Sequence, residues 1–574
     1  MPKSNVLKNP TFRARKRKYD HDLSCVKKFS SSVSQLLPVF YDFCYPGDKY
    51  DFRTEMFTQL REIVSPAMTH IEESVEWFFV PAKAICHTAP DSFTAVQDFH
   101  STFVPNHSDL NATPFPVRNF KNEANMVKTF IADNWNYGMM FNHVSDTFDL
   151  EGIDEFGVPY YFNLLRLSQL LGYGYYFFDI DSVGSLTHDL LLNVNFACVY
   201  QKIFMDCFRI DNRIDNDANY YNLDRYAIGG LITESVFKFF KMRYTPWAKD
   251  FFTSSLPSPL VDYGNIGMQH TEGSHSLADV NQPLSDSPSM INDGNRTVTI
   301  GQNLADFRVA LAVEKLMEIT RRAKKDYNSQ ILAHFGFDVP MGVSDNVYRL
   351  GSETTIFNIN EVVALSDGTN GQTSTSLGQK GGRGSAYRGM PKKGIRFTAP
   401  CHGFLMAIYH AVPQADYSAT GLDKLNTYRL RQDYWMPEFD QLGMSPTYIF
   451  QLAFDTVLFE NELTNGIMGW NYRYLESKLK QNLCYGIFTT NETFKSWTTQ
   501  RDFTSVDLAA QFTNPEFFYI SPTFIDSFML LHFQNAADDK MNPTTCFARD
   551  PMLHWFRFVV HKSSEISAYS MPSL

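Results

Sequence analysis

Asp250-Phe-Phe-Thr-Ser-Ser-Leu-Pro257, followed by Ser258-Pro259, separates two kinds of sequence in this chain. The residues before it are rich in aromatic side chains. From Ser258 to Gly301 the chain is dense in Ser, Asn, Asp, Gly and Pro, and large apolar side chains are sparse. Long polar segments of this kind run over protein surfaces. The pattern predicts a surface insertion over 258–301, and a stiff stem for it made by Asp250, Phe251, Phe252, Leu256 and Pro257.

The composition favours sheet over helix. The chain has 574 residues, of which 44% are hydrophobic and 15% aromatic, and only 20% are charged. Aromatic and β-branched side chains with frequent turn residues are typical of β-proteins. Short apolar or alternating runs predict strands far apart in the chain. We expect strands within 35–45, 49–56, 74–81, 404–412, 448–459, 517–520 and 555–560.

Helices and loops are expected between these strands. Apolar residues at helical spacing predict helices within 161–171, 195–210, 227–242 and 304–335. The segment 366–394 is rich in Gly, Ser, Thr and Lys, and predicts a mobile loop. The expected organisation is a flexible arm over 1–30 and one β-domain over 31–574, in which 84–330 is largely insertions.

Charge is distributed unevenly. The net charge of −11 argues against a surface that binds nucleic acid everywhere. However, seven basic residues between Lys3 and Lys18 precede the first acidic residue, Asp20. Such an arm can neutralise phosphates, or it can be a solvated tail. The candidate nucleic-acid contacts are Arg13, Arg15, Lys16, Arg17 and Lys18.

The cysteines indicate a reducing compartment. Eight cysteines are scattered along the chain without a CxxC pair, which predicts free thiols rather than a disulfide framework. The N-terminus lacks the apolar core of a signal peptide, and no run of about 18 apolar residues occurs. We therefore expect synthesis in a cytoplasm and no membrane span.

No complete catalytic or cofactor motif is present. The chain has no GxSxG and no HExxH, and Gly378–Gly384 lacks the ending of a phosphate-binding loop. Glu72, Glu73 and Glu76 could suggest acid–base chemistry, but Glu72 and Glu76 fit the solvent face of a strand better. We expect no enzyme and no cofactor.

Metal sites are not expected either. His270 and His275 are five residues apart, which does not place them on one helix face. Asp215–Asn219 resembles the start of a calcium loop, but its sixth and twelfth positions are tyrosines. A turn rich in Asp and Asn is the better interpretation, although a weak divalent-ion site stays open. Cys401-His402 and His410 fit a packed strand better than a ligand cluster.

An ordered set of motifs resembles one known family. The stretch DFFTSSLP at 250–257 is similar to the DYFTSALP-type signature of major capsid proteins of the gokushovirus-like Microviridae, which are small icosahedral single-stranded DNA phages. Further similarities follow in family order at 40–48, 77–81, 200–209, 304–308, 334–337, 434–437, 442–443, 469–474, 550–551 and 570–572. The chain departs from the family at Arg322-Ala-Lys324, where RGG is usual, and in the shortened 469–474 motif. These departures indicate a divergent branch.

The resemblance implies an eight-stranded antiparallel jelly roll with long loop and helical insertions. Sixty copies would form pentamers and a T=1 shell around circular single-stranded DNA, with other phage structural or DNA-binding proteins as partners. The insertion 258–301 would protrude from the shell and contact a receptor on the host cell. The resemblance thus implies a virion protein made in the bacterial host. The alternatives are a carbohydrate-binding or carbohydrate-active β-sandwich, and a host-recognition spike, although the fibrous repeats typical of a spike are missing.

Overall fold

The computed structural model describes much of the chain, with gaps. The described residues are 17–61, 63, 68–89, 93, 115–121, 160–173, 191–211, 213–226, 231–232, 237–258, 289–293, 296–300, 315–316, 319–320, 322–324, 327–337, 339–340, 345–363, 368–370, 373–375, 380–439, 443–453, 467–490, 494, 497–501, 503, 515–525 and 550–567.

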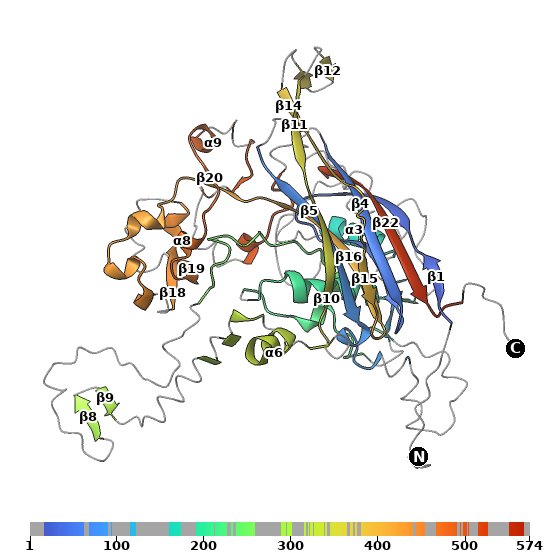
Figure 1. Cartoon of the computed structure of the whole chain (residues 1–574), viewed down its shortest axis with the longest axis horizontal. Coiled ribbons are helices and arrows are strands. Elements are labelled where there is room, and N and C mark those ends of the chain that lie inside the picture. Colours follow the sequence, from blue (N-terminus) through green and yellow to red (C-terminus); the bar gives the residue numbers. More distant parts are fainter. Residues whose placement is uncertain are drawn as a thin grey trace.

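The larger of two main sheets has seven antiparallel strands (Figure 1). Their bounds are β1 (Tyr19–Asp22), β2 (Cys25–Ser31), β4 (Lys49–Leu60), β11 (Asn358–Val363), β14 (Lys380–Arg388), β15 (Ile395–Thr398) and β22 (Met552–Ser564). The order is β1-β22-β4-β14-β11, and in addition β2 pairs with β22 and β15 with β4. Side chains alternate between buried and accessible along β4 and β22, so one face of this sheet is turned to the core.

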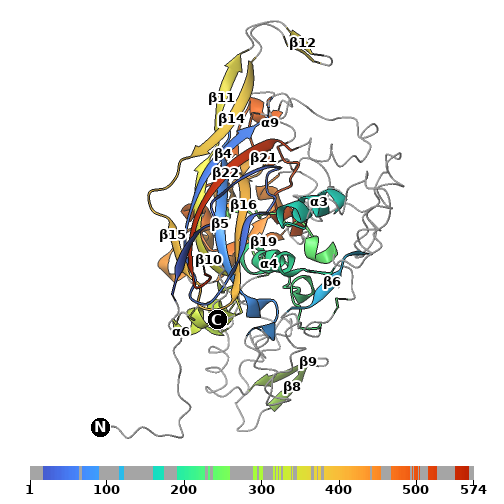
Figure 2. The same cartoon turned by 90° about the vertical axis from the view of Figure 1, so that its right-hand side faces the viewer.

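The smaller sheet has four antiparallel strands in the order β10-β5-β16-β3. They are β3 (Leu37–Cys44), β5 (Ile71–Pro81), β10 (Tyr348–Ile356) and β16 (Gly403–Pro413). Almost every residue of β5 and β16 is buried, because the second face of this sheet is covered as well. Helix α4 (Asn195–Ile203) packs on β5 and β16, and α3 (Tyr160–Leu170) packs on β3 (Figure 2).

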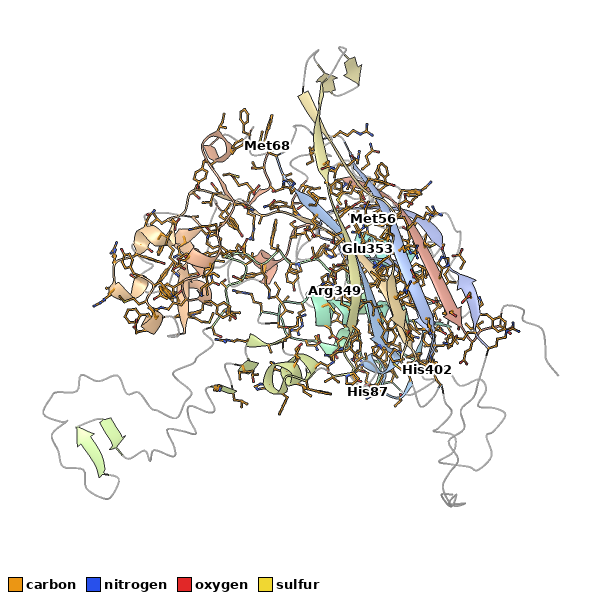
Figure 3. The ribbon with its side chains drawn as sticks, viewed as in Figure 1. Met56, Met68, His87, Arg349, Glu353 and His402 are labelled. Atoms are coloured by element: carbon orange, nitrogen blue, oxygen red, sulfur yellow. The ribbon has the colours of Figure 1, made fainter. Side chains whose placement is uncertain are left out.

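The core lies between the two sheets and is largely aromatic. The rings of Trp77 on β5 and Phe52 on β4 stack with centroids 4.5 Å apart and planes 9° from parallel. Phe40 on β3 approaches Phe558 on β22 at 5.8 Å. Aromatic pairs of this kind stabilise a core beyond the area that they bury. Figure 3 shows side chains filling the sandwich, with Met56 and Glu353 among those buried inside it.

A second, smaller lobe follows β16 and has its own apolar cluster. It contains a parallel three-stranded sheet and a hairpin, which lie apart from the sandwich in Figure 1. Its elements are β17 (Asp416–Ser418), η9 (Lys424–Thr427), η10 (Arg431–Asp433), η11 (Pro437–Phe439), β18 (Met444–Tyr448), η12 (Ile449–Gln451), β19 (Ile467–Tyr472), α8 (Leu475–Lys478), β20 (Leu483–Cys484), α9 (Ile487–Thr490), β21 (Gln500–Arg501) and η13 (Pro515–Phe518).

Short elements connect these parts. They are η1 (Ala82–Ala84), β6 (Val117–Asn119), β7 (Leu191–Asn193), the π-helical turn η5 (Phe204–Phe208), η6 (Ala218–Tyr220), η7 (Phe237–Phe240), the hairpin β8 (Ser289–Asp293) and β9 (Arg296–Ile300), α6 (Tyr327–Phe335), β12 (Gly368–Asn370) and β13 (Thr373–Thr375). None of the helices in the described part of the chain is long and apolar enough to cross a membrane.

The expected all-β core is confirmed, with few helices beside it. Among the described strands the two sheets do not close into a barrel. Five strand predictions are confirmed by β3, β4, β5, β16 and β22, and two helix predictions by α3 and by α4 with η5. The seven cysteines in the described residues are all free thiols, as predicted.

Five local predictions were wrong. The expected flexible arm over 1–30 contributes β1 and nearly all of β2 to the larger sheet. The expected strand at 448–459 ends at Tyr448, where the chain turns into η12, and 517–520 begins inside the short helix η13. In the described part of the expected helix 227–242, Leu231 forms an isolated β-bridge and the short η7 follows near the end. The expected loop at 366–394 contributes β14, which pairs with both β11 and β4. Of the expected helix 304–335, the structure describes α6 and a few residues before it.

Candidate nucleic-acid arm and protrusion stem

The root of the basic arm lies at the edge of the larger sheet. Arg17 places its guanidinium 5.7 Å from the centre of the Tyr19 ring, and Lys18 donates a hydrogen bond to the Gly47 carbonyl. Tyr19 then begins β1, which pairs with the end of β22. The other candidate contacts, Arg13, Arg15 and Lys16, lie outside the described residues.

The stem is organised by one carboxylate, that of Asp250. Its Oδ1 accepts hydrogen bonds from the backbone N–H groups of Phe252 and Thr253, at 2.9 and 2.8 Å. The Thr253 hydroxyl accepts in return from the Asp250 N–H at 2.8 Å. The Tyr417 hydroxyl donates to Asp250 Oδ2 at 2.5 Å. Because the short side chain of an aspartate can bond the backbone two and three residues ahead, this sequence folds into a tight turn.

The aromatic pair of the stem belongs to the core of the smaller lobe. Phe251 and Phe252 are 1% and 3% exposed, and Phe252 packs on the Tyr417 ring with centroids 5.0 Å apart. Leu256 is half-buried and exchanges two backbone hydrogen bonds with Trp470, at 2.9 and 2.8 Å. Pro257 is exposed. The structure therefore brings the five stem residues together as an anchor rather than as a binding surface.

The insertion beyond the stem lies almost entirely outside the described residues. Of 258–301 the structure describes Ser258 and the backbone of the hairpin formed by β8 and β9.

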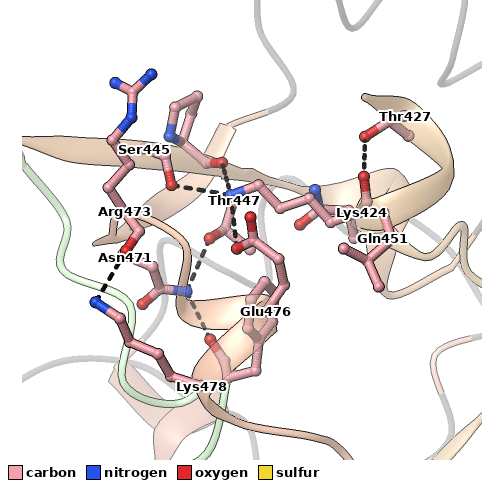
Figure 4. Close-up of polar contacts among 12 residues, drawn as sticks. Lys424, Thr427, Ser445, Thr447, Gln451, Asn471, Arg473, Glu476 and Lys478 are labelled. Carbon is pink, nitrogen blue, oxygen red and sulfur yellow. Dashed lines mark hydrogen bonds and ion pairs between the residues drawn. The ribbon is translucent and has the colours of Figure 1, made fainter. Parts of the chain in front are cut away.

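A polar cluster that the sequence did not predict joins the turns of the smaller lobe (Figure 4). The Lys424 ammonium donates to Ser445 Oγ at 2.9 Å and lies 3.5 Å from Glu476 Oε2. Tyr428 donates to the other oxygen of Glu476. Burial lowers the pKa of Lys424 more than the neighbouring Glu476 carboxylate raises it, so the net pKa is lowered. The cluster forms one wall of an open pocket of about 560 Å³, which Tyr448 and Phe450 also line. Nothing in the local sequence spacing pairs Lys424 with Glu476.

A second unpredicted cluster crosslinks three loops at one end of the sandwich, where Figure 3 labels His87. The His87 ring lies 2.6 Å from an Asp224 oxygen and 2.9 Å from an Asp345 oxygen. Burial lowers the pKa of His87, but the two carboxylates outweigh it, and the net pKa is raised. When protonated, the ring donates to both carboxylates and links the two loops.

The groups that the sequence singled out for chemistry are packed rather than assembled into a site. His402 stacks on Phe93 with centroids 4.7 Å apart, and His410 pairs with Glu76 at 3.3 Å. Asp217 caps the Asn219 N–H at 2.9 Å, as expected of a turn rich in Asp and Asn. His270 and His275 lie outside the described residues. No three His, Cys, Asp or Glu residues in the described part are placed to hold a metal ion.

The three glutamates of β5 differ from one another. Glu72 is exposed, and Glu76 is half-buried and accepts a hydrogen bond from Arg349 at 2.8 Å. Glu73 is fully buried between the sheets. The prediction that Glu72 and Glu76 lie on the solvent face of the strand is therefore confirmed for Glu72 and only in part for Glu76.

Comparison with known proteins finds one clear relative. Over 569 residues the chain is 22% identical to the capsid protein VP1 of Chlamydia phage 1, and the match covers 88% of this chain and 90% of the phage protein. No family model matches the chain. Similarity over almost the whole of both chains agrees with the order of the motifs described above. The chain is thus a distant relative of a major capsid protein of a gokushovirus in the Microviridae.

Proposed function

We propose that this protein is the major capsid protein of a small icosahedral phage, with a structural and non-enzymatic role in the virion. The observation that carries the proposal is the similarity to a phage capsid protein over 88% of the chain, with a two-sheet antiparallel core. The two sheets are those of a jelly roll, and sixty copies form pentamers and a T=1 shell around circular single-stranded DNA.

Exposed apolar side chains support self-association. On the smaller lobe Trp435 is 59% exposed and Tyr485 65%, and on α6 Phe335 is 81% exposed. Large apolar groups on a monomer surface mark contacts with other molecules when they gather in patches. In a closed shell each subunit presents different, complementary edges to its neighbours. The subunit contacts of the shell bury these groups.

Electron microscopy and sedimentation of the full chain expressed in bacteria test the proposal. We expect pentamers or closed shells of uniform size. Protein that stays monomeric under every assembly condition would overturn it.

The basic arm binds the packaged genome in this proposal. Replacing Arg13, Arg15, Lys16, Arg17 and Lys18 with serine removes five positive charges. Contacts to phosphates release counterions and are sequence-independent, so DNA retention is expected to fall while shells still form. The ratio of absorbance at 260 and 280 nm across the shell peak measures the loss. A matched variant with Lys478 and Lys480 changed to serine should keep its DNA, and an unchanged ratio in the arm variant would contradict the assignment.

The insertion 258–301 carries the contact with the host in this proposal. The stem is anchored in a core, so replacing 259–300 with a short Gly-Ser linker is expected to leave folding and assembly intact. Adsorption of assembled particles to host cells should be lost. Loss of all soluble protein would show instead that the insertion is part of the fold.

A further inference from the structure

A row of aromatic side chains crosses the outer face of the larger sheet. The register places Lys28 of β2 beside Trp555 of β22, Trp555 beside Phe57 of β4, and Phe57 beside Tyr387 of β14. Tyr387 is 62% exposed, Phe57 is 38% exposed and Trp555 is half-buried. Because neighbouring strands lie about 4.8 Å apart, the four positions span about 15 Å.

This face of the larger sheet exposes further apolar side chains beside the aromatic row. Leu553 and Val26, in the rows on either side, are each 50% exposed. Helix α4 packs on the opposite sheet, whereas no helix in the described part of the chain packs on β4 or β22 (Figures 1 and 2). Within the described residues, no helix covers the row.

Charge distinguishes between possible occupants. The basic side chains of this face are Lys28, Lys49, Arg53, Arg396 and Arg557, and its carboxylates are Asp20, Asp22, Asp51 and Glu55; the register puts Asp20 level with Lys49 and Asp22 level with Asp51. Arg53 and Arg396 share the carboxylate of Asp51, at 3.2 and 3.3 Å. Within the described residues, Lys28 and Arg557 form no ion pair. The face thus carries a small excess of basic side chains, and its unpaired cations Lys28 and Arg557 lie nearest the row, on a chain whose net charge is −11.

The position of the arm points to the same occupant. The arm enters this sheet through β1, which pairs with the other end of β22. The described root of the arm, Arg17 and Lys18, therefore leaves this sheet at the end of β22 away from Trp555. A polyanion that contacts the root of the arm can extend along the same sheet to the row.

We propose that the outer face of the larger sheet binds single-stranded DNA, with bases stacked on Trp555, Phe57 and Tyr387 and phosphates held by Lys28 and Arg557. Exposed rings beside basic side chains are the combination that binds unpaired strands without reading sequence. This inference rests on the proposed capsid function and makes this sheet the inner wall of the shell. A second copy of the chain would instead bury the row in a subunit contact.

Binding of a fluorescent oligothymidylate of about twenty nucleotides to the full-length chain tests the proposal. The arm variant with five serines is the starting protein, so that the sheet is measured alone. Trp555→Ala and Phe57→Ala are each expected to weaken binding about tenfold, since stacking on one ring contributes roughly that factor. Trp555→Phe should keep affinity within about threefold, because any aromatic face can stack.

Charge and control variants complete the test. Lys28→Ser and Arg557→Ser should each lower the slope of log affinity against log salt by about 0.7, measured between about 50 and 200 mM NaCl. Trp435→Ala and Tyr485→Ala, at exposed rings of the smaller lobe, should leave the affinity for the oligothymidylate unchanged, although they are expected to weaken subunit contacts. Unchanged affinity in the Trp555 and Phe57 variants overturns the inference, whether their shells form normally or not. If the Trp555 and Phe57 variants keep their affinity but no longer form shells, the row is a subunit contact. If the unaltered chain forms no shells at all, the capsid proposal fails, and this failure is independent of the result for the row.

Discussion

Replacing Asp550 with alanine is expected to destabilise the unassembled subunit by about 3–5 kcal/mol, because the change leaves a buried guanidinium without its counter-charge. Both oxygens of Asp550 accept from Arg166 Nη2, at 2.6 and 2.8 Å, and the two side chains are only 4% and 9% exposed. Ser30 donates to the same carboxylate at 2.5 Å, and Gln35 accepts from Arg166. This one ion pair ties α3 to the chain two residues before β22 begins.

Urea denaturation followed by circular dichroism measures the loss. The double variant Arg166→Met, Asp550→Leu should recover most of it, because apolar side chains of similar size remove both buried charges together. Asp423→Ala supplies a matched control at an exposed carboxylate that caps the short helix η9 with one hydrogen bond. A loss below about 1 kcal/mol for Asp550→Ala would show that water reaches Arg166 in solution.

The ion pair also shows where sequence reasoning reaches its limit. Asp550-Pro551 stands out as a family motif, and the leucines of 161–171 predict the helix that carries Arg166. Their pairing joins residues 384 positions apart, which no local pattern encodes. The same holds for Lys424 with Glu476 and for His87 with its two aspartates. Local periodicity predicts elements, whereas polar clusters depend on how those elements meet.

The errors in the predicted elements have physical causes. Gly381, Gly382 and Gly384 made 366–394 resemble a loop, yet they pair in register with β11. Glycine gives close packing at Gly384, since an added Cβ would lie 2.3 Å from Leu60 Cδ1 across the sheet and the Leu60 side chain would have to move. At Ile449 the apolar run looked like a strand, but it turns so that its side chains enter the small core of the lobe. Short apolar runs do not distinguish a strand from a packed turn.

The strands that were predicted correctly are those with the plainest patterns. β4 and β22 alternate over nearly their whole length, because one face meets the core and the other is accessible. The same alternation places Trp555 and Phe57 on the outer face, so the aromatic row is readable from sequence once the register is known. The register itself comes from pairing across almost five hundred residues and needed the structure.

Stability is expected to depend on pH through Glu73, which is fully buried between the sheets. Burial raises its pKa to about 7, against the hydrogen bonds from Thr58 and Tyr409 that lower it. Thr58 Oγ1 donates to Glu73 at 2.7 Å and lies 2.9 Å from His554 Nδ1. With the Thr58 proton directed at the carboxylate, the neutral His554 ring donates from Nδ1, and Ser31 donates to its other nitrogen, 2.7 Å away. Burial lowers the pKa of His554, so this ring stays neutral.

The sign of the effect follows from comparing the two states. Below the ordinary glutamate pKa of 4.5, Glu73 is protonated in both the folded and the unfolded chain and contributes no difference. Between 4.5 and about 7 only the folded chain holds the proton, so each rise in pH lowers stability. Above pH 7 the cost is constant, at about 3 kcal/mol for a shift of this size. His554 has the opposite effect within the same range, since its neutral folded form loses stability as the pH falls below the ordinary histidine pKa of 6.5.

Glu73→Gln keeps the shape of the side chain and removes the proton equilibrium. Compared with the unaltered chain, it should be about 2–3 kcal/mol more stable at pH 8, and the difference should shrink toward zero near pH 4.5. Urea denaturation at several pH values measures this difference. The control is Glu72→Gln, one residue earlier on the exposed face of β5, which removes the same charge from the surface instead of the interior. If the glutamine variant is the less stable one at pH 8, Glu73 is ionised in the fold and stabilised by its hydroxyl donors, and the interior of this sandwich accommodates a charge that burial alone would exclude.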